Sequence, residues 1–144
     1  MKLTFTKGAG KYDTLSFDTG APPLACPKQG ILPHDLLHLI VEAELRVGAF
    51  LTRAAAGTMT ATSVSDDADL QAVERIVETL QADLWSGPAS DDDLIAIYHH
   101  ACTARDHPPL PLSIDQLRAM RVRVADLGAA WDAVAVGGAL DLDL

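Results

Sequence analysis

The sequence ends in Gly137-Gly138-Ala139-Leu140-Asp141-Leu142-Asp143-Leu144, a stretch in which leucine and aspartate alternate strictly. Successive side chains of a β-strand point to opposite faces, so a period of two predicts a strand with one apolar face and one solvated face. The leucines of the apolar face need cover from other parts of the chain. The stretch therefore predicts a sheet to which the C-terminal part of the chain contributes a strand.

Residues 2–18 predict a β-hairpin that offers a matching apolar face. Leu3 and Phe5 alternate with polar neighbours, and so do Leu15 and Phe17. The glycines between these two runs tolerate positive φ, which tight hairpin turns require. We therefore predict one antiparallel sheet of three strands, formed by the N-terminal hairpin and the C-terminal strand.

The residues between these strands predict about four helices, because apolar side chains recur there at spacings of three and four. Pro33 is suited to a helix start, and residues 19–33 before it are rich in proline and glycine, which predicts an irregular connection. A loop is expected at 57–65. The predicted helices span residues 33–56, 66–86, 90–101 and 113–131.

The length of 144 residues fits one domain with a core of its own, so we predict a single α+β domain over residues 1–144, with the small antiparallel sheet packed on the helices. The hydrophobic fraction of 49% and the charged fraction of 22% are those of a globular protein. Aromatic residues make up only 5%, which favours a helical core of aliphatic side chains.

The charge and the cysteines limit the classes of partner and the compartment. A net charge of −9, with only 11 lysines and arginines, argues against nucleic acid as a partner, because phosphate backbones need a basic surface. No apolar run is long enough to cross a membrane, and no signal peptide is recognisable. Cys26 and Cys102 lie far apart and are expected to be reduced thiols, so we predict a cytoplasmic protein without a membrane partner.

The segment Pro33-His34-Asp35-Leu36-Leu37-His38-Leu39-Ile40-Val41-Glu42 holds the main candidate site. His34, His38 and Glu42 are spaced by four, so on a helix they follow one face. Two imidazoles one turn apart can share a divalent metal ion, and a carboxylate one turn further can supply a third ligand. We therefore take these three residues as candidate ligands for zinc or another divalent metal.

Within this segment, His34-Asp35-Leu36-Leu37-His38 resembles the H-E-x-x-H signature of zinc metallopeptidases, with aspartate in place of glutamate. The resemblance covers five residues. It implies that His34 and His38 bind zinc and that Asp35 is the catalytic base. Because aspartate is one methylene shorter than glutamate, the departure affects the catalytic role more than the metal-binding role.

A second group, His99, His100 and Cys102, lies on the third predicted helix and offers one further ligand. Adjacent residues on a helix diverge by about 100°, so His99 and His100 cannot both point at one ion. If the third helix packs beside the first, one member of this group would complete a site with His34 and His38.

The sequence leaves two functional hypotheses open. The first is a small, non-catalytic binding or interaction module, whose partner is an unidentified small molecule or protein. A homodimer is part of this hypothesis, because the helices carry more apolar surface than a three-stranded sheet can cover. The second is a metal-dependent, hydrolase-like protein built on His34, His38 and Glu42. In a third interpretation, His38 and Glu42 are merely the solvated stripe of an amphipathic helix.

Overall fold

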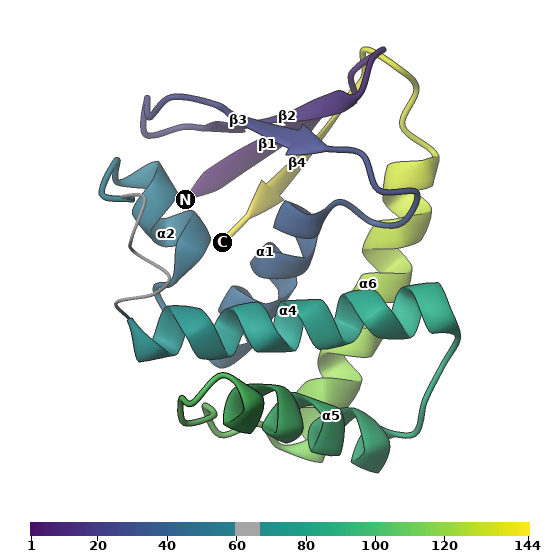
Figure 1. Cartoon of the computed structure of the whole chain (residues 1–144). Helices are drawn as coiled ribbons and strands as arrows, with labels where there is room; N and C mark the ends of the chain where they lie inside the picture. Colours follow the sequence, from purple (N-terminus) through teal and green to yellow (C-terminus); the bar gives the residue numbers. More distant parts are fainter. Residues whose placement is uncertain (60–66) are drawn as a thin grey trace.

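The computed structural model describes residues 1–59 and 67–144, which form a four-stranded sheet and five helices (Figure 1). The strands are β1 (Lys2–Thr6), β2 (Tyr12–Phe17), β3 (Leu24–Pro27) and β4 (Ala139–Asp143). The helices are α1 (His34–Leu45), α2 (Phe50–Ala55), α4 (Ala68–Ser86), α5 (Asp91–Ala104) and α6 (Ile114–Asp132).

The sheet joins the two ends of the chain, as the alternating patterns predicted. Its strand order is β3-β2-β1-β4 and all three pairings are antiparallel. Leu142 of β4 lies opposite Leu3 and Leu140 lies opposite Phe5, so the apolar sides of both strands face the helices. The α+β class, the N-terminal hairpin and the C-terminal strand are therefore confirmed.

The fourth strand, β3, was not predicted, because it lies in the segment that the proline content marked as irregular. It pairs with β2, and its Cys26 lies opposite Asp13. Proline is compatible with a sheet at an edge, where the missing N–H does not interrupt a ladder. β3 is such an edge, and it is only four residues long with Pro27 at its end.

The first helix ends earlier than its apolar pattern predicted. Arg46 takes a left-handed conformation, with φ of 54°, and its N–H donates to the carbonyl of Glu42. This conformation ends α1 at Leu45, and the chain then forms the separate short helix α2. Glycine is the usual residue in this position, so an arginine there gives no sequence signal for the helix end.

The starts of the other helices follow their capping residues. Asp67 accepts the N–H groups of Asp69 and Leu70 at the start of α4, and Ser90 Oγ accepts the N–H of Asp93 in α5. Asp66, predicted to share the start of α4, lies outside the described residues, as does most of the loop predicted at 57–65. Each capping interaction involves only three or four consecutive residues, so the helix starts can be predicted from the sequence.

Replacing Ser113 by alanine is expected to lower the free energy of unfolding by about 1 kcal/mol. Ser113 Oγ accepts the N–H of Gln116, and the Gln116 side chain accepts the N–H of Ser113, so the two residues form a capping box at the start of α6. Urea titration followed by circular dichroism measures the loss. Ser113→Thr keeps the hydroxyl group and is the control. An equal loss in both variants would contradict a capping role.

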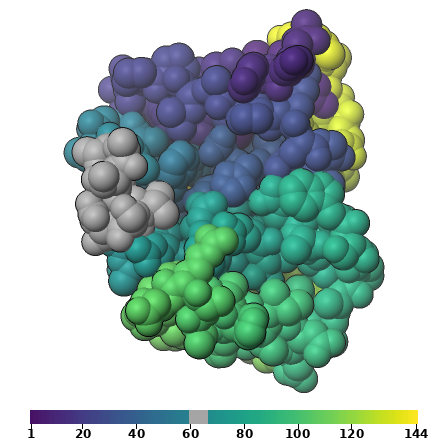
Figure 2. Space-filling view, in the orientation of Figure 1, coloured from purple at the N-terminus to yellow at the C-terminus, as the bar shows by residue number. Residues whose placement is uncertain are grey.

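α1 is the central helix of the fold. It packs against α4, α6, α2 and β3, and Figure 2 shows little of it because the sheet and α4 cover it from above and below. All residues from Asp35 to Glu42 are buried, the polar Asp35, His38 and Glu42 included. The polar side chains of α1 therefore need partners inside the protein.

No helix in residues 1–59 and 67–144 is both long and apolar enough to cross a membrane.

Candidate metal centre

Two histidines of α1 and a glutamate of α4 converge at the interface of the two helices. His34 Nε2 and His38 Nε2 lie 3.2 Å apart. The carboxylate of Glu74 lies 3.0 Å from His38 Nε2 and 3.3 Å from His34 Nε2. Each of the three side chains thus directs one donor atom at the same small volume.

The opposite directions of α1 and α4 bring these residues together. His34, at the start of α1, lies beside Gln81, and His38, one turn later, lies beside Glu74, which precedes Gln81 by seven residues. Glu74 follows Val73, which is fully buried in the core. It therefore sits at the rim of the helix interface, where its stem packs and its carboxylate reaches the imidazoles.

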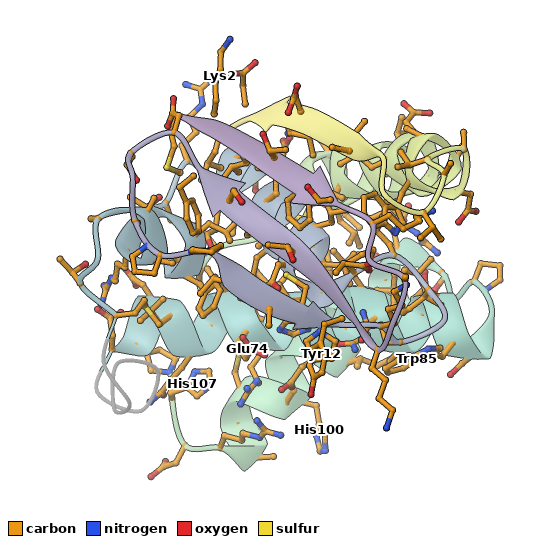
Figure 3. All side chains as sticks on the ribbon, turned by 90° about the horizontal axis from the view of Figure 1, so that it is seen from above. Lys2, Tyr12, Glu74, Trp85, His100 and His107 are labelled. Atoms are coloured by element: carbon orange, nitrogen blue, oxygen red, sulfur yellow. The ribbon has the colours of Figure 1, made fainter. Side chains whose placement is uncertain are left out.

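The cluster has a buried floor and a solvated rim. The side chain of His38 is 2% exposed, whereas those of His34 and Glu74 are 33% and 21% exposed. Figure 3 shows Glu74 at the level of α4, beneath the sheet in that view. One side of the cluster is thus enclosed by protein, and the other side can be reached by water or a small ligand.

The second nitrogen of each imidazole faces an oxygen atom. His34 Nδ1 lies 3.3 Å from Gln81 Oε1, and Gln81 in turn donates to Gln29 Oε1. His38 Nδ1 lies 3.5 Å from Glu42 Oε1. An oxygen atom near each Nδ1 can accept a proton held there, so Nε2 is the nitrogen of each ring that can give up its proton and bind an ion.

The two Nε2 atoms face each other and the Glu74 carboxylate, so the cluster favours a proton or a metal ion on these nitrogens. Burial alone would lower the pKa of His38, but the carboxylates of Glu42 and Glu74 outweigh it and raise that pKa to about 9. The hydrogen bond with Glu74 also raises the pKa of His34. Burial would raise the pKa of Glu74, but the two imidazoles hold it well below its usual range. The site therefore attracts positive charge.

The two imidazole nitrogens lie at the spacing of neighbouring ligands in tetrahedral metal coordination, and the Glu74 carboxylate faces both of them. Zinc–nitrogen distances of about 2.0–2.1 Å place neighbouring donors of a tetrahedron about 3.3 Å apart. The two Nε2 atoms lie 3.2 Å apart, Glu74 meets His38 through Oε2 at 3.0 Å and His34 through Oε1 at 3.3 Å, and one ligand atom from each residue lies within 4.8 Å of the others. Two histidines and one carboxylate are a ligand set of zinc sites that keep a fourth position open. His34 and Glu74 are partly exposed, so a fourth ligand could reach an ion from the solvated rim.

The structure distributes the sequence-predicted residues over different environments. It brings His34 and His38 together, but Glu42 lies at the far nitrogen of His38 and Glu74 takes the third position of the cluster. Because His38 and Glu42 are only 2% and 1% exposed, the interpretation as a solvated stripe is wrong.

Glu74 was not predicted as a site residue. The only signal for it in the sequence is its position next to Val73, a predicted core residue.

Asp35 lies against β3 rather than in the cluster. Burial and the neighbouring carboxylates of Asp35 and Asp13 raise the pKa of the Cys26 thiol well above its usual range, and Asp35 forms a hydrogen bond with that thiol. Asp35 is itself only 8% exposed. Asp35, which the metallopeptidase resemblance implies is the catalytic base, therefore contacts Cys26 instead of the cluster.

The residues proposed as further ligands on α5 are distant from the cluster. His99 and His100 are exposed, and His100 extends from α5 away from the body of the protein (Figure 3). Cys102 is fully buried, and its thiol interacts with Tyr98. α4 lies between α5 and α1, which keeps all three side chains away from His34 and His38 (Figure 1).

Cys26 and Cys102 are both unpaired, as the sequence predicted.

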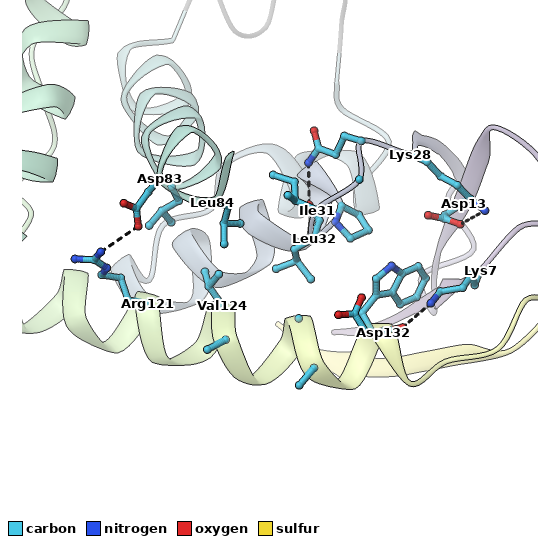
Figure 4. Close-up of a pocket in the computed structure, with 18 of the residues that line it drawn as sticks. Lys7, Asp13, Lys28, Ile31, Leu32, Asp83, Leu84, Arg121, Val124 and Asp132 are labelled. Carbon is cyan, nitrogen blue, oxygen red and sulfur yellow. Dashed lines mark hydrogen bonds and ion pairs between the residues drawn. The ribbon is translucent and has the colours of Figure 1, made fainter. Parts of the chain in front are cut away.

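A pocket of about 850 Å³ lies between α4, α6 and residues 28–33 (Figure 4). Its middle is apolar, and its basic side chains are already engaged. Arg121 pairs with Asp83 at 3.1 Å, and Lys28 pairs with Asp13 at 3.6 Å. Lys7 donates to the carbonyl of Trp131 and lies over its ring. Most charged side chains that line the pocket thus already have partners in the protein, and Asp132 is exposed.

Comparisons with protein-family models, with curated proteins and with solved structures find no match to this chain. The fold and the cluster are therefore the basis for any functional conclusion. They define an α+β protein with a candidate centre of two imidazoles and one carboxylate.

Proposed function

We propose that this protein binds one divalent metal ion, zinc before others, through His34, His38 and Glu74. The observation that carries the proposal is the convergence of two imidazole nitrogens and one carboxylate, with one ligand atom from each residue within 4.8 Å of the others. Zinc accepts imidazole and carboxylate ligands together, whereas magnesium and calcium prefer oxygen alone. The combination of the two donor types favours zinc.

A metal held by three protein ligands has one position for water or for an atom of a ligand. Two neutral imidazoles and one carboxylate leave an ion of charge +2 with a net charge of +1. Such an ion attracts anionic oxygen donors and lowers the pKa of a bound water to about 7. The position at the solvated rim is accessible to a small molecule or to a side chain of a protein partner.

We propose that this centre is used for binding rather than for hydrolysis. Asp35 contacts Cys26, and Glu42 is enclosed behind His38. Within the described residues, the cluster of possible ligands consists of His34, His38 and Glu74, and it contains no second carboxylate to activate water. The hydrolase-like alternative, favoured by the open position itself, requires a base that the substrate or a partner supplies.

Zinc binding is expected to be lost in Glu74→Gln, His34→Ala and His38→Ala. Chelator-treated wild-type protein should bind one equivalent of zinc in a calorimetric titration. Each ligand variant should bind at least about 100-fold more weakly, a larger loss than is typical of residues outside the coordination shell. Glu78→Gln is the matched control, because Glu78 lies one turn further on α4 and pairs with Arg75 instead.

Two results would overturn the proposal. If the wild-type protein binds no zinc, cobalt or nickel, the cluster is an ion-pair network between α1 and α4. If zinc binds equally well to His38→Ala, the ion is held at the surface and the cluster is not the site. Far-UV circular dichroism of every variant establishes that the fold is kept.

We also propose a cytoplasmic location and partners other than nucleic acid. The two cysteines are unpaired and buried, which fits a reducing compartment. The net charge of −9 fits partners that are not phosphate backbones. Self-association is a further proposal, supported by exposed apolar side chains on adjacent helices, such as Ile97 of α5 and Val122 of α6.

A further inference from the structure

Two buried polar atoms beside the cluster make no hydrogen bond with any described residue. They are Nδ1 of His38 and Oε2 of Glu42. Both side chains are almost completely enclosed, with exposures of 2% and 0%. They belong to the same helix, one turn apart, and His38 Nδ1 lies 3.5 Å from the other oxygen of the Glu42 carboxylate. Unpaired buried polar atoms are costly, so a pair of side chains that contains two of them calls for a role beyond the stability of the fold.

We propose that Glu42 is a positioning residue of the metal centre, which accepts the Nδ1–H of His38 and connects the centre to α2. This inference rests on the proposed function. His38 can offer a metal only Nε2, because that atom faces Glu74 and His34. Its Nδ1 then carries the proton, and the Glu42 carboxylate is the acceptor within reach. Such a carboxylate fixes the ring orientation and makes the imidazole a stronger ligand.

The same carboxylate also holds the start of α2. Glu42 Oε1 accepts the N–H of Leu51 at 2.9 Å. The ring of Phe50, the residue before it, lies with its centroid 4.9 Å from that of His38. α2 is six residues long, too short to be stable by its own hydrogen bonds. A metal ion that fixes His38 therefore also restricts α2, through Glu42 and through Phe50.

Zinc affinity is the first test of the positioning role. Glu42→Gln keeps the shape of the side chain but removes its charge, and it should weaken zinc binding about 10-fold to 100-fold. Glu42→Leu removes the acceptor as well and should weaken binding further. Glu44→Gln is the matched control with the same charge change on the same helix, and its zinc affinity should equal that of the wild type.

Nuclear magnetic resonance provides a readout that a merely structural role of Glu42 would not change. In the wild type, with or without zinc, the His38 Nδ1–H proton should be visible and protected from exchange. Glu42→Leu should abolish that protection. Zinc should slow hydrogen exchange at the Leu51 amide in the wild type and in Glu44→Gln, but not in Glu42→Leu.

The outcomes separate this inference from the proposed function. If zinc binding depends on His38 but is unchanged in Glu42→Gln and Glu42→Leu, the positioning role is overturned and the metal site stands. An exchanging Nδ1–H proton in the zinc-loaded wild type would also overturn it. If the wild type binds no metal, the proposed function fails, and this inference fails with it.

Discussion

Removal of residues 138–144 is expected to lower the free energy of unfolding by about 2–4 kcal/mol or to prevent folding. The deletion takes away β4, whose leucines Leu140 and Leu142 pack against the core. It also exposes the edge of β1, so that the completely buried Leu3 and Phe5 lose cover. Backbone bonds beyond the strand are lost too, such as the one from the N–H of Lys7 to the carbonyl of Gly138.

Thermal and urea unfolding of the truncated protein measure this loss. Leu142→Ala provides a milder variant for the case in which the truncated chain does not fold, and it should also be destabilised. Asp143→Asn, on the solvated face of β4, is the control and should unfold like the wild type within about 0.5 kcal/mol. A truncated protein with the melting temperature of the wild type would show that β4 contributes nothing to the core.

The stability of the metal-free protein is expected to fall as the pH rises through about 9. The pKa of His38 is raised from its usual 6.5 to about 9, so the folded state binds this proton more tightly than the unfolded state does. The resulting stabilisation is complete below about pH 6.5 and is lost above about pH 9. Its size is of the order of 3 kcal/mol, because one pKa unit corresponds to about 1.4 kcal/mol. The lowered pKa of Glu74 arises from the same contact with the imidazoles. It is therefore not counted as a second contribution to the free energy of unfolding.

Urea unfolding of chelator-treated protein between pH 6 and pH 10 tests this expectation. His38→Gln should lose most of the decrease, whereas His100→Gln, which changes an exposed histidine of α5, should keep it. Zinc affinity should show the opposite trend and rise between pH 6 and pH 9, because the ion and the protons compete for the same nitrogen atoms. A stability that is identical in wild type and His38→Gln at every pH would show that His38 is not charged in the folded state.

The strands at the two chain ends could be predicted because each carries its own period-two pattern. Leu3, Phe5, Leu140 and Leu142 identify their apolar faces without reference to any other part of the chain. β3 could not be predicted, since it is a strand only through its pairing with β2. The end of α1 at Leu45 was hidden for a similar reason, because an arginine occupies the left-handed position that follows it.

The candidate site was predictable only within one turn of helix. The spacing of four between His34 and His38 places their side chains together in any helix. Glu42 was expected to be a third ligand, but a rise of about 1.5 Å per residue separates it from His34 by about 12 Å along the axis, too far for one ion. Glu74 follows His38 by 36 residues. Its position depends on the packing of α4 against α1, which no local pattern contains.

The origin of the three donor atoms in two helices has a consequence for the order of events during synthesis. His34 and His38 leave the ribosome long before Glu74, and between them lie the left-handed turn at Arg46 and the whole of α2. The three donors meet only after α4 has docked on α1. Under the proposed function, all three ligands become available to an ion only after this docking, so the ion would stabilise the finished helix pair rather than start its folding.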